Sequence, residues 1–528
     1  MWGQCLMQRR TCARVLRQAL AALALLAATG TAAFGEPIDP LLAPSPLPDA
    51  TPPPPAVPPP LPVYPRLALL ETALALSGAI IWYRTDGHFN AKDWDYNWSW
   101  STWKKRLITF DAVRFDDNAF SINALVHPLD GTGIYLIARG NRLSPLPSFL
   151  ITVAGSTIWE FVVEYREVVS INDMIFTPMA GFAVGEPMVR LSNLLRAGDP
   201  GPVKEVLATL LNPIDAMNGW FEGGRPASAG PTDAYGLPLL YRHRLELAAG
   251  VGHAEFGPAG TSNELEARAD LFVDATPTLS EPARRAGFVG PGALAWLVAS
   301  ISGNSNWQTA GGRIQSEVAV GGWLLRQTLE SEGGQPTSSR SLFLGFGTAF
   351  EYASRSFPRF TDALGVVRLA GPLVDWGLRR GGLDVHFVGD LFYDFAMVRA
   401  LALDDYLHAN GGGALSSVLA QQGYYFAQGV SASLRLIVEY GRLEVGGAVT
   451  EDDFWSIRGR DRFQPSELEP AARDRRGAVH AWWAVRPWLR SPLRALLVFD
   501  RLTREGRFDG YDASLSEVRF STALDLKF

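Results

Sequence analysis

Four residues in the N-terminal third of the chain have side chains that could do chemistry: His127, Glu160, Glu164 and Asp173. An imidazole and carboxylates can bind a divalent ion or share a proton. In an apolar helical layer their pKa values would shift into the range that general acid/base catalysis uses. Hydrolysis or acyl transfer on a lipid is one reaction of this kind, and Ser156, one turn before Glu160, is the nearest hydroxyl that could serve as nucleophile.

No established catalytic motif accompanies these residues. Ser156 does not lie in a Gly-x-Ser-x-Gly sequence, and the chain has no His-Glu-x-x-His. A structural polar network that fixes one helix against another needs the same residue types and is commoner than a site. Three interpretations therefore stay open: a structural network, an enzyme, and an ion site with His127, Glu160 and Glu164 as candidate ligands. No cofactor is predicted, and binding of a divalent cation or of another ligand is left open.

Residues 66–212 must position these side chains, and their pattern predicts helices. Ser144 followed by Pro145 predicts a helix start, and the apolar stretch that follows runs to about Glu167. Glu160, Glu164 and Glu167 then fall on one helical stripe, where their mutual repulsion must be offset by water, a cation, an arginine or a shared proton. Another apolar run, from 67 to 82, is short for a bilayer span and predicts a buried or interfacial helix rather than a membrane anchor.

A second helix is predicted to begin after Ser170, which has capping-box spacing to Asp173. Thr177, Gly181 and Gly185 continue the Asp173 stripe in steps of four, and such small residues allow another helix to approach closely. The preceding helix, which carries the glutamates, is the most natural partner. We therefore predict an antiparallel helical hairpin with these two faces in contact or sharing a polar cavity.

An ordered set of motifs resembles a known family. It comprises His127-Pro128-Leu129-Asp130-Gly131, Tyr135, Asn141, Trp159-Glu160, Glu164, Ser170-Ile171-Asn172-Asp173, Thr177-Pro178, Gly181 and Gly185-Glu186. The set is similar to domain of unknown function 3943 over roughly residues 82–196. This sequence departs from the family pattern at Leu129-Asp130, where Tyr-Gln is usual, and at Phe182, where a second glycine is common. The resemblance implies a bacterial envelope protein and supplies no mechanism.

From residue 239 to 528 the hydrophobic period changes to two. In 383–394, for example, Leu383, Val385 and Phe387 alternate with Asp384 and His386, which is typical of strands with one apolar and one polar face. Repeated strands of this kind in a secreted chain predict an all-β transmembrane barrel of about 12 antiparallel strands, range 10–14. A linker is expected at 213–238. The helical region is expected to plug the lumen or to cap the barrel on its periplasmic side.

The last strand has the form of a terminal assembly signal. Its apolar side ends with Phe520, Leu524, Leu526 and Phe528, and the chain stops on the aromatic residue itself. This pattern resembles the signals that the outer-membrane barrel assembly machinery reads. That machinery and the outer-membrane lipids are therefore the predicted partners, while the oligomeric state is left open.

The N-terminal residues and the composition are consistent with this location. Residues 1–35 have a basic stretch, an apolar core and small residues at Thr29–Ala33, which predict a secretory signal peptide that also holds both cysteines, Cys5 and Cys12. Residues 36–65 form a proline-rich linker with 14 prolines. The formal charge of −6 and the absence of a Lys/Arg run exclude a nucleic-acid surface.

Two functions follow from these observations. The first is a Gram-negative outer-membrane barrel with a structural or transport-related role and no assigned chemistry. The alternative is an integral outer-membrane enzyme, a hydrolase or acyltransferase acting on lipid or lipopolysaccharide through the His127, Glu160 and Glu164 cluster.

Overall fold

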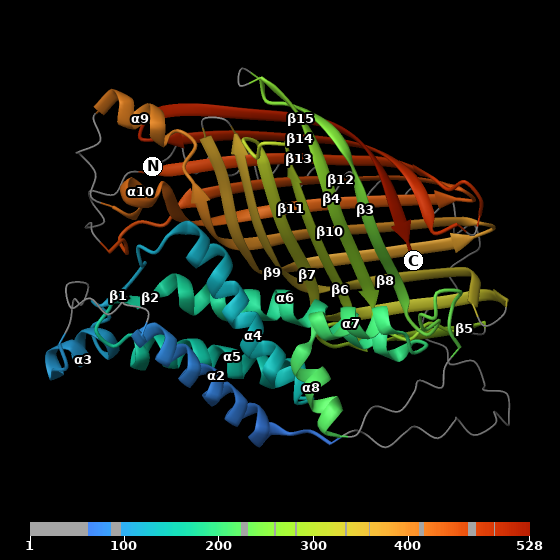
Figure 1. Ribbon diagram of the computed structural model, residues 1–528, viewed down its shortest axis with the longest axis horizontal. Helices are drawn as coiled ribbons and strands as arrows, with labels where there is room; N and C mark the ends of the chain where they lie inside the picture. The colour runs from blue at the N-terminus through green and yellow to red at the C-terminus, as the bar shows by residue number, and fades with distance from the viewer. Residues whose placement is uncertain are drawn as a thin grey trace. The chain divides into compact units, whose positions relative to one another are not determined.

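In the described part of the chain, seven helices, α2 to α8, are followed by thirteen strands, β3 to β15 (Figure 1). The computed structural model describes residues 62–85, 97–222, 231–257, 260–279, 282–332, 335–357, 360–410, 417–462, 471–489 and 491–528. The predicted signal peptide and nearly all of the proline-rich linker lie outside these residues. Residues Val63–Phe528 form one unit.

The N-terminal part is helical, as predicted, and we call α2 to α8 the helical layer. Its helices are α2 (Pro65–Thr85), α3 (Trp100–Leu107), α4 (His127–Gly140), α5 (Pro145–Ile158), α6 (Ile171–Ala197), α7 (Pro202–Leu211) and α8 (Pro213–Phe221). Two π-helical turns, η1 (Ile122–Val126) and η2 (Trp159–Val163), and two short strands, β1 (Val113–Arg114) and β2 (Val169–Ser170), lie between them. Helix α8 occupies the start of the segment expected to be a linker, because Asn212 caps a new helix there by accepting from the Asp215 N–H.

The remaining strands form the barrel. They are β3 (Arg242–Glu255), β4 (Thr261–Asp274), β5 (Ala283–Val289), β6 (Leu294–Gly303), β7 (Ala310–Glu332), β8 (Gln335–Phe357), β9 (Phe360–Arg380), β10 (Leu383–Arg399), β11 (Tyr424–Tyr440), β12 (Leu443–Ser456), β13 (Ala472–Val485), β14 (Leu493–Phe508) and β15 (Tyr511–Lys527). Two short helices, α9 (Leu403–Asn410) and α10 (Val418–Gln422), lie in the connection between β10 and β11.

The strand pairing closes the sheet on itself. Each strand is antiparallel to its neighbours, β15 pairs with β3, and β7 pairs with β8. Strands β5 and β6 share one position, since β6 pairs with the first half of β7 and β5 with the second half. The result is a closed antiparallel barrel with 12 strand positions, which confirms the predicted fold class and strand count.

The alternation along each strand separates the two faces of the barrel as predicted. On β4, Glu266, Arg268 and Asp270 line the lumen, whereas Leu265 on the other face is 69% exposed. On β15, the terminal-signal residues Phe520, Leu524 and Leu526 are on the outer face, and Phe528 continues the pairing with β3 through two backbone hydrogen bonds to Leu245. We call the end of the barrel where β15 stops the terminal end, and the end with α9 and α10 the loop end.

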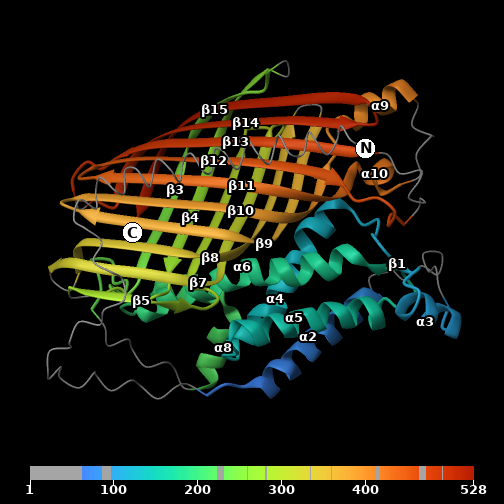
Figure 2. The same ribbon diagram turned by 180° about the vertical axis from the view of Figure 1, so that it is seen from behind.

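The helical layer lies on the outer wall of the barrel (Figures 1 and 2). Helix α6 contacts β4 and β6 to β9. Its Phe176, Ala180 and Ala183 pack against Phe350 of β8, Val367 of β9 and Phe395 of β10. These three strand residues alternate with the lumen-facing Glu351, Arg368 and Asp394, so they point outward. The expectation that the helical region plugs the lumen is therefore wrong for the described residues.

The loop end of the lumen is filled by a different segment. Leu403 and Tyr406 of α9 and Leu419 beside them pack against inward-facing apolar residues of β9 to β12, among them Ala396 and Phe454. A chain segment that enters a barrel mouth with apolar side chains removes that apolar surface from water. The part of the chain that closes the barrel at this end is thus the β10–β11 connection.

Candidate functional site

A short parallel pairing places an aspartate that the sequence analysis did not single out. Strand β1 pairs with β2, joining Val113 to Val169 and Arg114 to Ser170. Asp116, two residues after β1, is held there because its N–H donates to Asn172 Oδ1 at 3.2 Å and its Oδ2 accepts from Ser170 Oγ at 3.2 Å. The pairing therefore brings Asp116 to the start of α6, where Asp173 lies.

The π-helical turn η1 leads directly into α4 and places His127 opposite these aspartates. The His127 Nε2 atom lies 3.5 Å from Asp173 Oδ2, and its Nδ1 atom lies 3.7 Å from the exposed Asp130 Oδ2. The Nε2 atom is buried and has no hydrogen-bond partner among the described residues. One ligand atom each from Asp116, His127 and Asp173 lies within 4.8 Å of the other two.

Glu160, Glu164 and Glu167, which were predicted to share one helical stripe, do not share it. Helix α5 ends at Ile158, and η2 then turns the chain so that the three carboxylates point to different partners. Glu160 is buried and accepts from the Ser170 N–H at 2.8 Å. Glu164 accepts from the Trp159 indole at 2.7 Å, and Glu167 accepts from the Tyr83 hydroxyl at 2.5 Å. The prediction of a common stripe is wrong because the helical period is interrupted by one π-turn.

Two features compensate for the burial of polar groups in residues 159–167. The fully buried Arg106 guanidinium donates to the backbone oxygens of Glu160, Tyr165 and Glu167, which have left the regular helix. Burial and then the neighbouring Glu167 charge together raise the pKa of the Glu164 carboxyl to about 7, although the Trp159 hydrogen bond acts to lower it. The predicted repulsion between these carboxylates is thus met by separation and by a shifted protonation equilibrium.

The hydroxyl considered as a nucleophile is engaged elsewhere. The Ser156 Oγ donates to the backbone oxygen of Asp173 at 3.2 Å, so this hydrogen bond ties α5 to α6. The Ser156 hydroxyl therefore does not donate to His127. The structure therefore brings His127 and Asp173 together, as the sequence analysis suggested, and adds Asp116, while Glu164 lies with Trp159. The enzyme remains the alternative that the sequence left open.

The small-residue stripe of α6 is a helix contact, but its partner differs from the predicted one. Helix α5 is antiparallel to α6, as the Ser156–Asp173 contact at one end and the Phe149–Phe182 ring pair at the other show. A Cβ on Gly181 would lie 2.7 Å from the backbone of Gly131, and one on Gly185 would lie 2.5 Å from the Tyr135 ring. Both belong to α4, so Thr177, Gly181 and Gly185 accommodate α4 instead of α5.

The barrel wall takes part in the site through one tyrosine. The Tyr424 hydroxyl, at the start of β11, donates to Asn118 O at 2.7 Å and accepts from Asn123 Nδ2 at 3.1 Å. The same Asn123 amide donates to Asp116 Oδ1 at 2.5 Å. The Asp116, His127 and Asp173 cluster therefore lies where the helical layer meets the barrel near the loop end.

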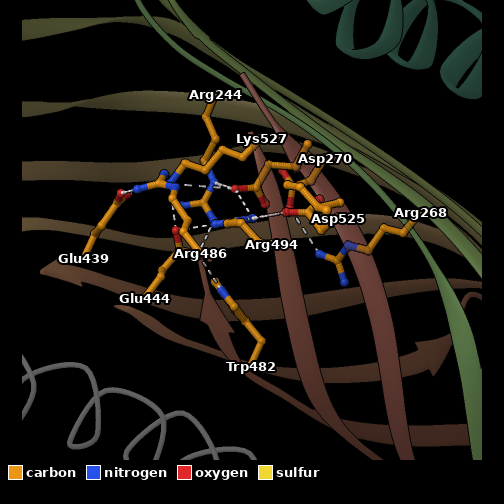
Figure 3. Close-up of polar contacts among 12 residues, drawn as sticks. Arg244, Arg268, Asp270, Glu439, Glu444, Trp482, Arg486, Arg494, Asp525 and Lys527 are labelled. Atoms are coloured by element: carbon orange, nitrogen blue, oxygen red, sulfur yellow. Dashed lines mark hydrogen bonds and ion pairs between the residues drawn. The ribbon is translucent and has the colours of Figure 1, made fainter. Parts of the chain in front are cut away.

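The lumen contains a second set of charged residues, none of which the sequence analysis had named as a site. Figure 3 shows Arg244, Arg494 and Lys527 converging on Glu444, with distances of 2.7 Å in each case. Two further contacts cross the lumen closer to the loop end. They join Arg268 to His480 and Arg476 to Glu351. A cavity of about 220 Å³ lies beside Arg244, Arg268, Arg476 and His480.

The closed barrel, apolar outside and polar inside, defines an outer-membrane β-barrel protein with an N-terminal helical region. Residues 112–214 match the family model described as Domain of unknown function (DUF3943), which confirms the resemblance found in the sequence. No curated protein sequence matches the chain.

Several solved outer-membrane barrels are similar to this chain. The translocator domain of autotransporter NalP from Neisseria meningitidis is 12% identical, with 55% of this chain and 88% of that chain covered and a TM-score of 0.20. A loop-deletion mutant of OmpT from Vibrio cholerae is 10% identical, with 55% and 99% covered and a TM-score of 0.17. The TodX monoaromatic hydrocarbon channel is 8% identical, with 54% and 90% covered and a TM-score of 0.20.

Proposed function

We propose that this protein is a structural component of the outer membrane whose barrel does not conduct solutes. One observation carries the proposal: contacts between charged and polar side chains cross the lumen and join strands that lie far apart on its circumference. Arg244 of β3 forms an ion pair with Glu444 of β12 near the terminal end, and Arg355 of β8 forms one with Glu517 of β15 toward the loop end. Midway between them, Arg268 of β4 donates a hydrogen bond to His480 of β13.

The remaining space in the lumen supports the same conclusion. Ligand pockets usually enclose ~300–1,000 Å³, and the lumen cavity beside Arg244 and His480 and the one beside Arg242 and Arg379 are both smaller, at about 220 Å³ each. Helix α9 and the apolar cluster around Tyr406 fill the loop end of the lumen, on the loop-end side of the ion pairs. A transported solute would have to break buried ion pairs, whose separation leaves uncompensated charges in a low-dielectric interior.

Conductance in planar lipid bilayers tests this proposal. The wild-type protein should leave the conductance at background. A variant in which residues 403–422 are replaced by a short Gly/Ser linker, combined with Arg244→Ser, Arg268→Ser and Arg355→Ser, should conduct, because it lacks both the apolar closure and the three guanidinium groups that cross the lumen. Single-channel currents of porin size from the wild-type protein would contradict the proposal.

The helical layer is proposed to lie at bilayer depth beside the barrel. Helix α6 has 27 residues and so is ~40 Å long at 1.5 Å per residue, and it covers outward barrel residues that would otherwise face lipid. Two stretches, Pro65–Tyr83 and Pro145–Val163, are long and apolar enough to cross a membrane, yet only 11% and 28% of their residues are buried. Of the two alternatives predicted from the sequence, the buried helix is excluded, because α2 is an exposed helix of 21 residues.

The ends of α2 carry the residues expected at a membrane surface. Tyr64 precedes its first turn, and Trp82, which is exposed, lies in its last turn. Aromatic residues at both ends of an apolar span of ~20 residues are typical of helices in a bilayer. We therefore take outer-membrane lipid as the partner of the α2 and α5 surface. Recognition of the terminal strand, from Phe520 to Phe528, by the barrel assembly machinery remains part of the proposal.

Spin labels on single cysteines test the depth of α2, since the predicted mature chain has no cysteine of its own. A label at Leu74→Cys should be relaxed by oxygen and shielded from a water-soluble nickel complex. A label at Leu524→Cys, on the outer face of β15, is the lipid-exposed control, and one at Asp512→Cys, beside an exposed turn, is the aqueous control. If Leu74→Cys behaves like Asp512→Cys, the helical layer lies outside the bilayer, as in the periplasmic position expected from the sequence.

A further inference from the structure

We infer that Asp116, His127 and Asp173 form a binding site for one divalent transition-metal ion, such as Zn²⁺ or Mn²⁺. One ligand atom from each residue lies within 4.8 Å of the other two. Ligands at ~2.1 Å from an ion are at most ~4.2 Å apart, so side-chain rotations that move these atoms by well under ~1 Å would complete the coordination. The cluster combines three segments, since Asp116 follows β1, His127 begins α4 and Asp173 lies in the first turn of α6.

The histidine has the orientation that a metal ligand needs. Its Nδ1 atom faces the Asp130 carboxylate at 3.7 Å, and a carboxylate in this position is the usual outer partner that orients the ring of a metal-binding histidine. The Nε2 atom points to the Asp173 side and is buried without a hydrogen-bond partner among the described residues. A buried nitrogen that makes no hydrogen bond loses the interaction it has with water, and a metal ion would restore it.

The two aspartates are held in place by neutral amide groups. Asn123 Nδ2 donates to Asp116 Oδ1, and Asn172 Nδ2 donates to Asp173 Oδ1 at 2.9 Å. Asn123 is itself fully buried, and its Oδ1 atom has no hydrogen-bond partner in the described part of the chain. Such outer hydrogen bonds orient the carboxylates of metal sites. They leave Asp173 Oδ2 directed to the imidazole.

The local charge also favours a cation. Asp116 and Asp173 are 7% and 4% exposed, and the buried Glu160 is linked to the same segment through Ser170. Among the residues that the structure describes, no lysine or arginine forms an ion pair with either aspartate, and His127 is the only basic side chain beside Asp173. Buried carboxylates at such short separation need a cation or shared protons.

The ligand types select the class of ion. Imidazole suits first-row transition metals, whereas Mg²⁺ and Ca²⁺ prefer oxygen ligands alone. Three protein ligands also leave at least one coordination position for water or for a second group. The π-helical turn η1 immediately precedes His127, and π-turns of this kind are frequent at functional sites.

Metal content of the purified full-length protein tests the inference. The protein in detergent is stripped with a chelator, incubated with Zn²⁺ or Mn²⁺, freed of excess ion and assayed by elemental analysis. We expect one ion per wild-type chain. Loss of an outer-shell partner alone weakens metal binding by about 10–100-fold, so Asp116→Asn, His127→Gln and Asp173→Asn should each weaken it by at least ~100-fold. Asp130→Asn, which removes only the Nδ1 partner, should fall in between.

A matched control and a second measurement keep the test decisive. His253→Gln changes an exposed histidine of β3 that hydrogen-bonds Asn263, and it should bind the ion as the wild type does. Should a ligand variant fail to fold, Mn²⁺ bound to the wild-type chain is followed by electron paramagnetic resonance and displaced by Zn²⁺, Ca²⁺ or Mg²⁺. Displacement by Zn²⁺ at far lower concentration than by Ca²⁺ supports the site. A stripped wild-type protein that takes up no ion, or folded ligand variants that bind as the wild type does, would overturn it.

Discussion

Replacing Arg494 by methionine should lower the free energy of unfolding of the barrel by about 3–5 kcal/mol, the usual cost of removing one partner from a buried ion pair. Arg494 is 1% exposed and contacts Glu444 at 2.7 Å, Glu246 at 2.8 Å and Asp525. Methionine preserves much of the side-chain volume but leaves these carboxylates with fewer cations. Urea unfolding in lipid vesicles, followed by the loss of heat-modifiable migration, measures the effect.

The same terminal hairpin contains a matched control. Arg507 of β14 pairs with Asp512 of β15 at 2.7 Å, but both side chains are more than 60% exposed. Exposed pairs contribute ~0–1 kcal/mol, since water screens them, so Arg507→Met should be almost neutral. Equal effects of Arg494→Met and Arg507→Met would show that the lumen network is hydrated and does not close the barrel.

The strands could be predicted from the sequence because alternation depends only on local residue types. The outward Val385 and Phe387 and the inward Asp384 and His386 of β10 follow a period of two that no other regular structure produces. The helix start at Pro145 is local in the same sense, since the proline itself favours the first helical turn.

The place of the helical layer could not be predicted from the same pattern. Outward residues such as Phe350, Val367 and Phe395 are apolar, and this is equally suitable for contact with lipid or with the apolar face of α6. Alternation thus identifies the outer face of the barrel but does not show what covers it. The small-residue stripe on α6 likewise indicates a close helix contact without identifying α4 as the partner.

Two of the three residues of the candidate metal site could be identified from the sequence. His127 and Asp173 could be selected because each begins a predicted polar or helical element. Asp116 could not, because it reaches the site through the β1–β2 pairing with residues more than 50 positions away. The π-turn η2 could not be predicted from the sequence either. It is stabilised by contacts with residues outside the turn: the Ser170 N–H donates a hydrogen bond to the Glu160 carboxylate, and Arg106 donates to the Glu160 backbone oxygen.

The second large effect on stability is expected from Gly131→Ala, which adds a single methyl group to α4. A Cβ on Gly131 would lie 1.8 Å from the backbone oxygen of Thr177 in α6, far inside van der Waals contact, and a backbone atom cannot rotate away as a side chain can. Gly131→Ala therefore has to push α4 away from α6. Overpacking of this kind costs ~1–3 kcal/mol and occasionally more, and we expect about 3 kcal/mol here.

The glycine two residues farther along provides the control. A Cβ on Gly133 meets nothing within 4 Å, so Gly133→Ala should stabilise α4 by ~0.5–1 kcal/mol through its better helix propensity. Urea unfolding of the helical layer, followed by far-UV circular dichroism, compares the two variants on one helix. Because His127 lies one turn before Gly131, a shift of α4 should also weaken metal binding in Gly131→Ala but not in Gly133→Ala. Equal stability of the two variants would mean that α4 and α6 are not in the close contact that brings His127 to Asp173.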